Sequence, residues 1–134
     1  MNYIELRNTV PREVEQIVVL AFLDEKLVLV RDGKVDRFPI AHVMQNEEFS
    51  ISVRRALYEQ TGALLAESTM LGWWHGEPGM AVYVGIVDRL DAPIVTGQRV
   101  VSDIDVAYQS LDASWDVVKA FLFYHAYKLI RKMQ

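Results

Sequence analysis

The stretch that decides the fold is FPIAHVMQNEEFSISVRRALYEQTGA, which runs from Phe38 to Ala63. Apolar side chains recur at helical spacing along one broad stripe of its second half: Phe49, Val53, Ala56 and Leu57. That period is typical of a surface helix that packs one face on a core. Gly62 follows the last periodic residues, where a residue with positive φ commonly ends a helix. The stretch therefore predicts a loop, an amphipathic helix over about residues 48–61 and a glycine stop.

The same stretch resembles the Nudix box, the motif G-x5-E-x7-R-E-U-x-E-E-x-G-U of Nudix hydrolases, in which U is a bulky aliphatic residue. The spacing of the motif is kept throughout, and five of its defined positions carry the expected residue type: Glu47, Arg55, Leu57, Glu59 and Gly62. The Phe38-Pro39 lead-in also looks like the aromatic-proline approach of the family. The resemblance implies an α/β/α sandwich and a pyrophosphohydrolase activity that depends on Mg²⁺.

Several positions of the box carry other residues. Ala41 stands where the motif has its first glycine, and Ile40 replaces the glycine before it. Ala56 and Gln60 replace two glutamates, and Ala63 is smaller than the usual aliphatic. The box is therefore degenerate in residue type although its spacing is intact.

Two of these departures lie at positions that bind metal in the family. Positions 56, 59 and 60 share one helix face, which in the family carries the carboxylates that hold Mg²⁺ against a pyrophosphate. Here that face carries Ala, Glu and Gln, so we expect Glu59 and the Gln60 carbonyl to hold at most one weakly bound Mg²⁺ or Mn²⁺. Loss of a positioned base lowers a rate on the order of 10²–10⁴-fold. The sequence therefore predicts that hydrolysis is weak or lost.

The remaining catalytic candidates come from the same resemblance. Glu59 is the main candidate, assisted by Glu47. Glu47 is also expected to form a structural pair with Arg55 that ties the loop to the helix. Asp103 lies in the segment Ser102–Val106, which looks like an acidic loop that supplies a further ligand or base in some family members. Asp103 or Asp105 would then partly replace the carboxylate lost at position 56, although acidic residues near a strand are common.

Three residues are candidates for substrate binding. Arg31 and Arg37 flank an Asp-Gly turn, and they either contact phosphate as bidentate donors or, as we favour, solubilise strand ends. Trp73 and Trp74 are adjacent, so on a strand they point to opposite faces. One is expected in the core, and the other, taken here as Trp73, could stack on a nucleobase, which contributes about 1–3 kcal/mol.

Composition narrows the class of protein. The 134 residues are 51% hydrophobic and 24% charged, which is typical of a single globular domain. Cysteine is absent, so disulfides and thiolate zinc sites are excluded. Without an apolar run of membrane-spanning length or a signal sequence, we expect a cytoplasmic protein. The net charge of −4 favours neither nucleic acid nor a membrane as a partner.

The rest of the chain predicts a mixed sheet of short strands and a long last helix. Strands are expected at 3–7, 17–23, 27–30, 35–38, 64–74, 80–87 and 98–101, with a connection from 88 to 97 and the last helix at about 114–132. Composition and periodicity alone give α/β or α+β, and the resemblance selects the sandwich with one helix on each face of the sheet. Four aromatic residues extend beyond the apolar stripe of the last helix: Phe121, Phe123, Tyr124 and Tyr127. One interpretation is that they form the surface of a homodimer.

Three functions are consistent with this sequence. The first is a divergent Nudix-type pyrophosphohydrolase that acts on a small nucleoside-diphosphate-linked compound. The second is a non-catalytic nucleotide-binding module on the same scaffold. The third is a protein-interaction module that works through the aromatic last helix.

Overall fold

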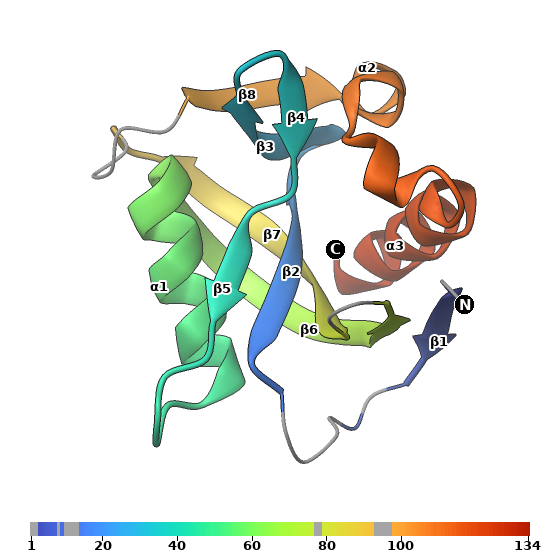
Figure 1. Cartoon of the computed structure of the whole chain (residues 1–134). Coiled ribbons are helices and arrows are strands. Elements are labelled where there is room, and N and C mark those ends of the chain that lie inside the picture. Colours follow the sequence, from blue (N-terminus) through green and yellow to red (C-terminus); the bar gives the residue numbers. More distant parts are fainter. Residues whose placement is uncertain (1–2, 8, 10–13, 77–78, 93–97) are drawn as a thin grey trace.

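A mixed eight-stranded β-sheet separates helices on its two faces (Figure 1). The computed structural model describes residues 3–7, 9, 14–76, 79–92 and 98–134. The main path of the sheet is β1 (Tyr3–Leu6), β6 (Ala63–His75), β7 (Met80–Leu90), β2 (Gln16–Leu23), β3 (Lys26–Asp32) and β4 (Val35–Arg37). Two further strands lie off this path: β5 (Ile40–His42) pairs with β2, and β8 (Gln98–Asp103) pairs with β3. Strands β2 and β7 run parallel, and the other pairs in the described chain are antiparallel.

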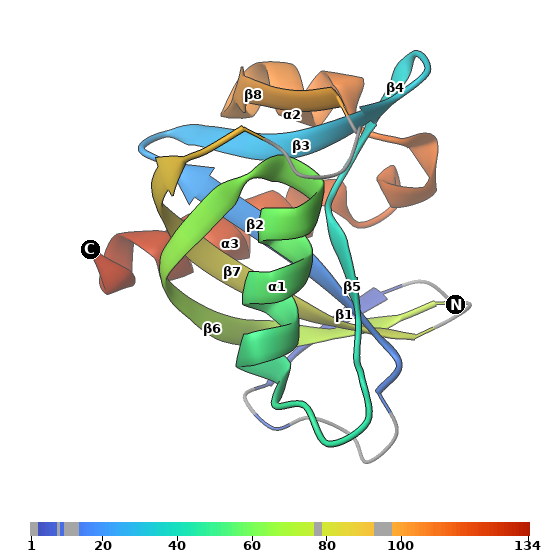
Figure 2. The ribbon, with the colours of Figure 1, turned by 90° about the vertical axis from the view of Figure 1, so that its left-hand side faces the viewer.

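Helix α1 (Phe49–Thr61) covers one face of the sheet, as the sequence predicts, and Figure 2 shows it in front of the strands. Its buried side chains Val53, Ala56 and Leu57 join a core cluster with alternate residues of β2 such as Ile17 and Val19. The helix ends at Gly62, whose φ is 75°. A side chain there would also collide with the carbonyl of Asp91, so both the left-handed conformation and the close approach require glycine.

The other face of the sheet packs against α3 (Lys119–Met133). This helix begins later than the predicted residue 114, because a short 3₁₀ turn at Ala113–Trp115 precedes it. Trp115 is buried between Phe38 and Trp74, at ring-centroid distances of 5.2 and 4.8 Å. The buried indole fixes the chain at this turn, and α3 then runs along the sheet with Leu122, Ala126 and Ile130 in the core.

Two short elements differ from the sequence prediction. Strand β5 forms within the segment expected to be a loop, where Ile40 pairs with Val18 and His42 with Gln16. The acidic segment at 102–106 is the end of β8 followed by α2 (Ile104–Ser110), with Asp103 at the helix boundary. The predicted connection from 88 begins as the last residues of β7, and residues 93–97 lie outside the described chain.

The predicted mixed sheet with one helix on each face is confirmed by this arrangement of α1 and α3. Within the described chain, no helix has the length and hydropathy needed to cross a membrane.

Candidate functional site

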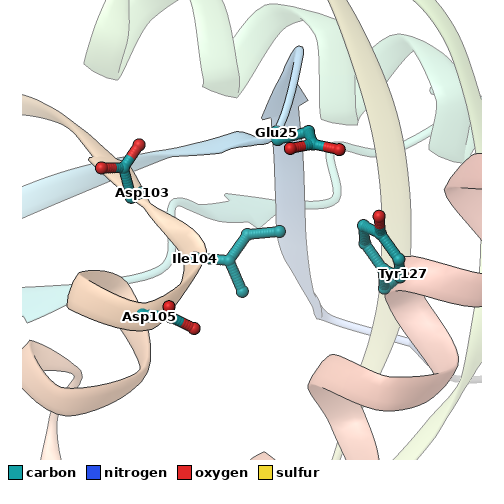
Figure 3. Close-up of a pocket in the computed structure, with 5 residues that line it drawn as sticks. All are labelled: Glu25, Asp103, Ile104, Asp105 and Tyr127. Carbon is teal, nitrogen blue, oxygen red and sulfur yellow. The ribbon is translucent and has the colours of Figure 1, made fainter.

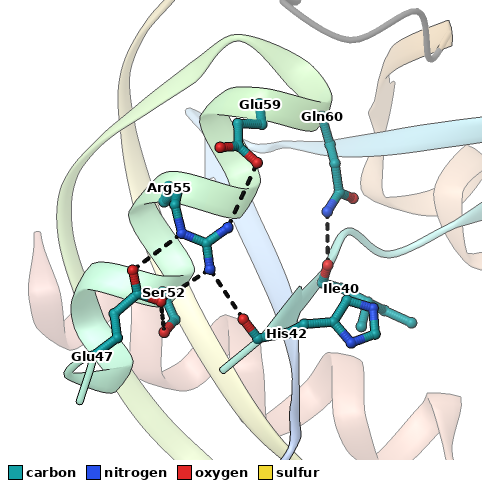
Figure 4. A network of polar contacts seen from close by, with 7 residues as sticks. All are labelled: Ile40, His42, Glu47, Ser52, Arg55, Glu59 and Gln60. Atoms are coloured by element: carbon teal, nitrogen blue, oxygen red, sulfur yellow. Dashed lines mark hydrogen bonds and ion pairs between the residues drawn. The ribbon is translucent and has the colours of Figure 1, made fainter. Parts of the chain in front are cut away.

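Three polar side chains join the start of α1 to the loop before it, and we call them the box clamp: Glu47, Ser52 and Arg55 (Figure 4). Arg55 donates to both carboxylate oxygens of Glu47, with Nε–Oε2 3.1 Å and Nη2–Oε1 2.9 Å. The hydroxyl of Ser52 donates to Glu47 Oε1. Arg55 Nη2 also donates to the carbonyl of His42 at 3.0 Å, so the clamp attaches α1 to β5.

The box clamp sets the charge of its carboxylate. The hydrogen bonds from Arg55, and next those from Ser52, lower the pKa of Glu47 to about 2. Glu47 is therefore ionised over the whole physiological pH range, and its two oxygens already accept hydrogen bonds from protein donors. Those contacts leave it the role of a structural anion.

The next turn of α1 carries the positions that bind metal in the Nudix box, and we call them the metal face: Ala56, Glu59 and Gln60. Ala56 is 4% exposed and belongs to the core cluster under α1. Glu59 forms an i,i+4 ion pair with Arg55 at 3.6 Å. Gln60 Nε2 donates to the carbonyl of Ile40 at 2.7 Å. Figure 4 shows that the two polar side chains point to different partners.

The metal face does not fit a multi-carboxylate Mg²⁺ site. Mg²⁺ is usually bound by one or two carboxylates together with substrate phosphates. Glu59 is the single carboxylate on this face, and a metal would have to draw it away from Arg55. The carbonyl oxygen of Gln60 is buried and has no hydrogen-bond partner among the described residues. Those residues contain no group of three or more His, Asp or Glu side chains arranged to hold a metal ion.

Asp103 lies in a different hollow. A cavity of about 430 Å³ is lined by Asp103 together with Glu25, Ile104, Asp105 and Tyr127 (Figure 3). It lies where the turn between β2 and β3 meets the start of α2, and Asp103 is in register with Lys26 of β3. Among the described residues that line this cavity, none belongs to the box. The structure therefore brings Asp103 together with Asp105 and Glu25, and places Glu59 elsewhere.

The two candidate arginines make protein contacts. Arg31 holds the buried carboxylate of Asp36 in a bidentate pair, with Nε–Oδ1 2.8 Å and Nη2–Oδ2 3.2 Å. This pair lowers the pKa of Asp36 and engages the Arg31 guanidinium. Arg37 Nη1 lies 3.5 Å from the carbonyl of Phe38 and lines a cavity of about 190 Å³ beside Trp115.

The tryptophan pair confirms the strand geometry. Trp74 is 6% exposed and packs on the α3 side of the sheet, whereas Trp73 packs partly exposed against the cluster on the α1 side. The ring of Trp73 lies edge-on to His75 at a centroid distance of 6.4 Å. Trp73 is therefore the tryptophan with an accessible surface, on the same side of the sheet as the box.

Sequence reasoning missed two sets of contacts. Ser52 completes the box clamp, and its signal was a small polar residue three positions before Arg55, on the same helix face. Gln60 donates to the backbone carbonyl of Ile40, and Arg55 donates to that of His42. Backbone carbonyls are present at every position, so residue type gave no signal for them.

Three solved structures that are similar to this chain are named as hydrolases. A mutant of the Bacillus subtilis pyrophosphohydrolase BsRppH matches with a TM-score of 0.72 and 16% identity, over 96% of this chain and 90% of that chain. A NUDIX hydrolase from Nitrosomonas europaea matches with a TM-score of 0.56 and 19% identity, over 71% and 75%. An ADP compounds hydrolase matches with a TM-score of 0.64 and 15% identity, over 88% and 71%. No protein-family model and no curated protein sequence matches this chain.

These likenesses define the class of architecture: the chain has the Nudix hydrolase fold.

Proposed function

We propose that this chain is a divergent Nudix-type protein that acts on a small nucleoside-diphosphate-linked compound, with Mg²⁺-dependent pyrophosphohydrolase activity that is weak or lost. One observation carries the proposal. The metal face holds a single carboxylate, and both of its polar side chains, Glu59 and Gln60, make contacts within the protein. The substrate class follows from the fold and from the activities printed for its neighbours, a pyrophosphohydrolase and an ADP compounds hydrolase.

The residues divide into those that would contact substrate and those that would position it. Glu59 is the one carboxylate of the metal face and the candidate for any residual metal binding or base catalysis. Glu47 acts through Arg55 as a positioning residue. Trp73, partly exposed on the α1 side of the sheet, is the candidate for a contact with the base. Arg37 lines a cavity beside Trp115 on the α3 side, so its contact with phosphate stays a prediction. A role for Asp103 requires a movement that brings its cavity to the metal face, so it stays a prediction.

A phosphate-release screen tests the proposal. It is coupled to pyrophosphatase for the triphosphates and to a phosphatase for the dinucleoside polyphosphates and nucleotide sugars, because their hydrolysis gives pyrophosphate or phosphomonoesters. The substrates are nucleoside di- and triphosphates, dinucleoside polyphosphates and nucleotide sugars, each with Mg²⁺ and with Mn²⁺. The blank is Glu59→Ala, which removes the remaining carboxylate of the metal face without touching the Glu47 carboxylate. We expect slow hydrolysis that disappears in the blank, or none. Fast turnover that persists in the blank would contradict the assignment of the site to α1.

A non-catalytic binding module is the second candidate. It is favoured by the bond from Gln60 to the Ile40 carbonyl, because this contact closes the metal face with no ion present. Thermal stabilisation by a nucleotide in EDTA, with no hydrolysis, would select this candidate. Stabilisation that requires Mg²⁺ would select the hydrolase. A concentration-dependent oligomer with no ligand response would favour the interaction module, for which Phe121 and Tyr124 are exposed on α3.

A further inference from the structure

Another hollow lies at the β1 edge of the sheet, between the end of β1, β6 and the outer side of α3. Its volume is about 350 Å³, within the range of small-molecule sites. We call it the basic hollow, and it is lined by Leu6, Arg7, Met70, Leu71, His125, Lys128, Leu129 and Lys132. Figure 1 shows β1 and α3 facing each other at this edge of the molecule.

Positive charge converges on this hollow from two elements. Arg7 comes from the end of β1, and Lys128 and Lys132 come from one face of α3, four residues apart. Residues 119–133 contain no Asp or Glu, although the whole chain has a net charge of −4. None of the described residues that line the hollow is acidic. The nearby carboxylate of Glu5 lies 3.6 Å from Arg7 Nη1 and offsets part of this charge.

The helix dipole explains only part of this arrangement. Cations in the last turn of a helix are stabilised by its negative end, and this accounts for Lys132. It does not account for Arg7, which belongs to another element. Lys128 and Lys132 also repel each other at i,i+4 spacing, so an anion between them would relieve an unfavourable interaction.

One donor of Arg7 has no acceptor among the described residues. Arg7 Nη2 donates to Thr9 Oγ1 at 3.2 Å, and the backbone N–H of Arg7 donates to the Leu71 carbonyl at 3.2 Å. These contacts fix the position of the side chain. Its Nε is buried and has no hydrogen-bond partner among the described residues. A buried donor without an acceptor is costly, so a shift of the Arg7 side chain that exposed Nε to a ligand oxygen would be favourable.

The floor of the hollow is apolar. Leu6, Met70, Leu71 and Leu129 contribute it, and Leu6 is 46% exposed. A bare inorganic ion would leave this surface in water. A ligand that carries both an anionic group and an apolar body would cover it and gain the free energy of removing apolar surface from water.

We propose that the basic hollow binds a small phosphorylated molecule. Its phosphate lies among Arg7, Lys128 and Lys132, and its apolar body lies on Leu71 and Leu129. Three cations from two elements suit the multiply charged phosphate group. This site does not depend on the function proposed for α1, because none of the described residues that line it belongs to the box.

An NMR titration in EDTA tests the site with two probes, inorganic phosphate and hexyl phosphate. We expect saturable shifts of the backbone amides at Leu6, Arg7, Leu71 and Leu129. Hexyl phosphate should bind at least about tenfold more tightly than inorganic phosphate, because its chain covers the apolar floor. The Glu59→Ala protein should bind both probes as the native chain does, which separates this test from that of the box.

Matched variants test the charge. Lys132→Gln and Lys128→Gln should each weaken hexyl phosphate binding about tenfold, through loss of a charge-assisted hydrogen bond. The control is Arg131→Gln, the same change in net charge one residue away, where the guanidinium lies 5.8 Å from the ring of Tyr127. This control should change the affinity less than about twofold at physiological ionic strength, because exposed charges are screened.

Several results would overturn the proposal. They are shifts that do not saturate, shifts that map to α1, and equal weakening in the Arg131→Gln control. Binding to vesicles of anionic phospholipid with none to soluble hexyl phosphate would also reject a small-molecule site, and would identify the surface as a membrane contact.

Discussion

The box clamp and the metal face differ in how closely their residues match the Nudix box motif. The loop before α1 and the first half of the helix carry the residues of the box clamp, with Arg55 held between Glu47 and the carbonyl of His42. The metal face has the spacing of the motif but only one carboxylate, that of Glu59. The clamp stabilises the fold by itself, whereas a metal face is needed only when an ion binds. The comparison shows that the residues of the box with structural contacts match the motif, whereas two of the three positions of the metal face do not.

The box clamp and the metal face nevertheless both form hydrogen bonds to strand β5. Arg55 bonds to the carbonyl of His42, and Gln60 bonds to the carbonyl of Ile40, so α1 holds β5 at both ends. Buried backbone carbonyls need partners, and β5 is three residues long. The change from carboxylate to amide at position 60 therefore has a structural gain, since an amide donates to a carbonyl and a carboxylate cannot.

The largest effect is expected from restoring the two missing carboxylates of the metal face. The double change Ala56→Glu with Gln60→Glu should raise Mg²⁺-dependent hydrolysis on the order of 10²-fold or more, if loss of carboxylates limits the rate. The measurement is phosphate release over the same substrate panel. Ala56→Gln is the control for size, because position 56 is buried. A double variant that folds and binds Mg²⁺ without any gain would contradict the explanation.

Removing the centre of the clamp should have the next largest effect. Arg55→Ala leaves the Glu47 carboxylate without its main donor and the His42 carbonyl without a partner from α1. We expect the melting temperature to fall by roughly 5–10 °C. Arg89→Ala is the control, since the side chain of Arg89 is 67% exposed and its ion pair with Asp91 contributes little. Equal falls in the two variants would show that the clamp has no special role.

Gln60→Glu should separate the structural and the metal role of this position. In EDTA, loss of the bond to Ile40 should lower the free energy of unfolding by about 1–3 kcal/mol. Mg²⁺ should restore part of that loss, because the new carboxylate and Glu59 can share an ion. Gln60→Met loses the same bond and should not respond to Mg²⁺. Denaturant titrations with and without Mg²⁺ measure both effects.

The smallest effect is the pH dependence of the clamp. The pKa of Glu47 falls from 4.5 to about 2 on folding, so the unfolded state binds the proton more readily. The contribution of Glu47 to stability is present above pH 4.5 and is lost as the pH falls from 4.5 toward 2. Glu47→Gln should therefore give a flatter acid limb in thermal melts over this range. Asp36→Asn is the comparison, because Arg31 also lowers the pKa of Asp36; an unchanged limb in Glu47→Gln would contradict the role of the clamp.

Local pattern predicted much of the architecture. The helix over the box, its stop at Gly62 and the buried strand that became β2 follow from periodicities of 3.6 and 2 and from one backbone conformation. These are properties of a few neighbouring residues. The late start of α3 did not follow, because it depends on Trp115 packing against Phe38 and Trp74 from other elements.

The sequence by itself determined the residues of the site: a box with intact spacing, one carboxylate at position 59, and alanine and glutamine where two others would be. Only the tertiary structure decided their partners. It joined Glu59 to Arg55 and Gln60 to the Ile40 carbonyl, placed Asp103 in a separate hollow, and brought Arg7 to Lys128 and Lys132. The physical reason is distance along the chain. Helical periodicity is set by residues three and four apart, whereas the partners of a polar side chain are set by how distant strands and helices pack.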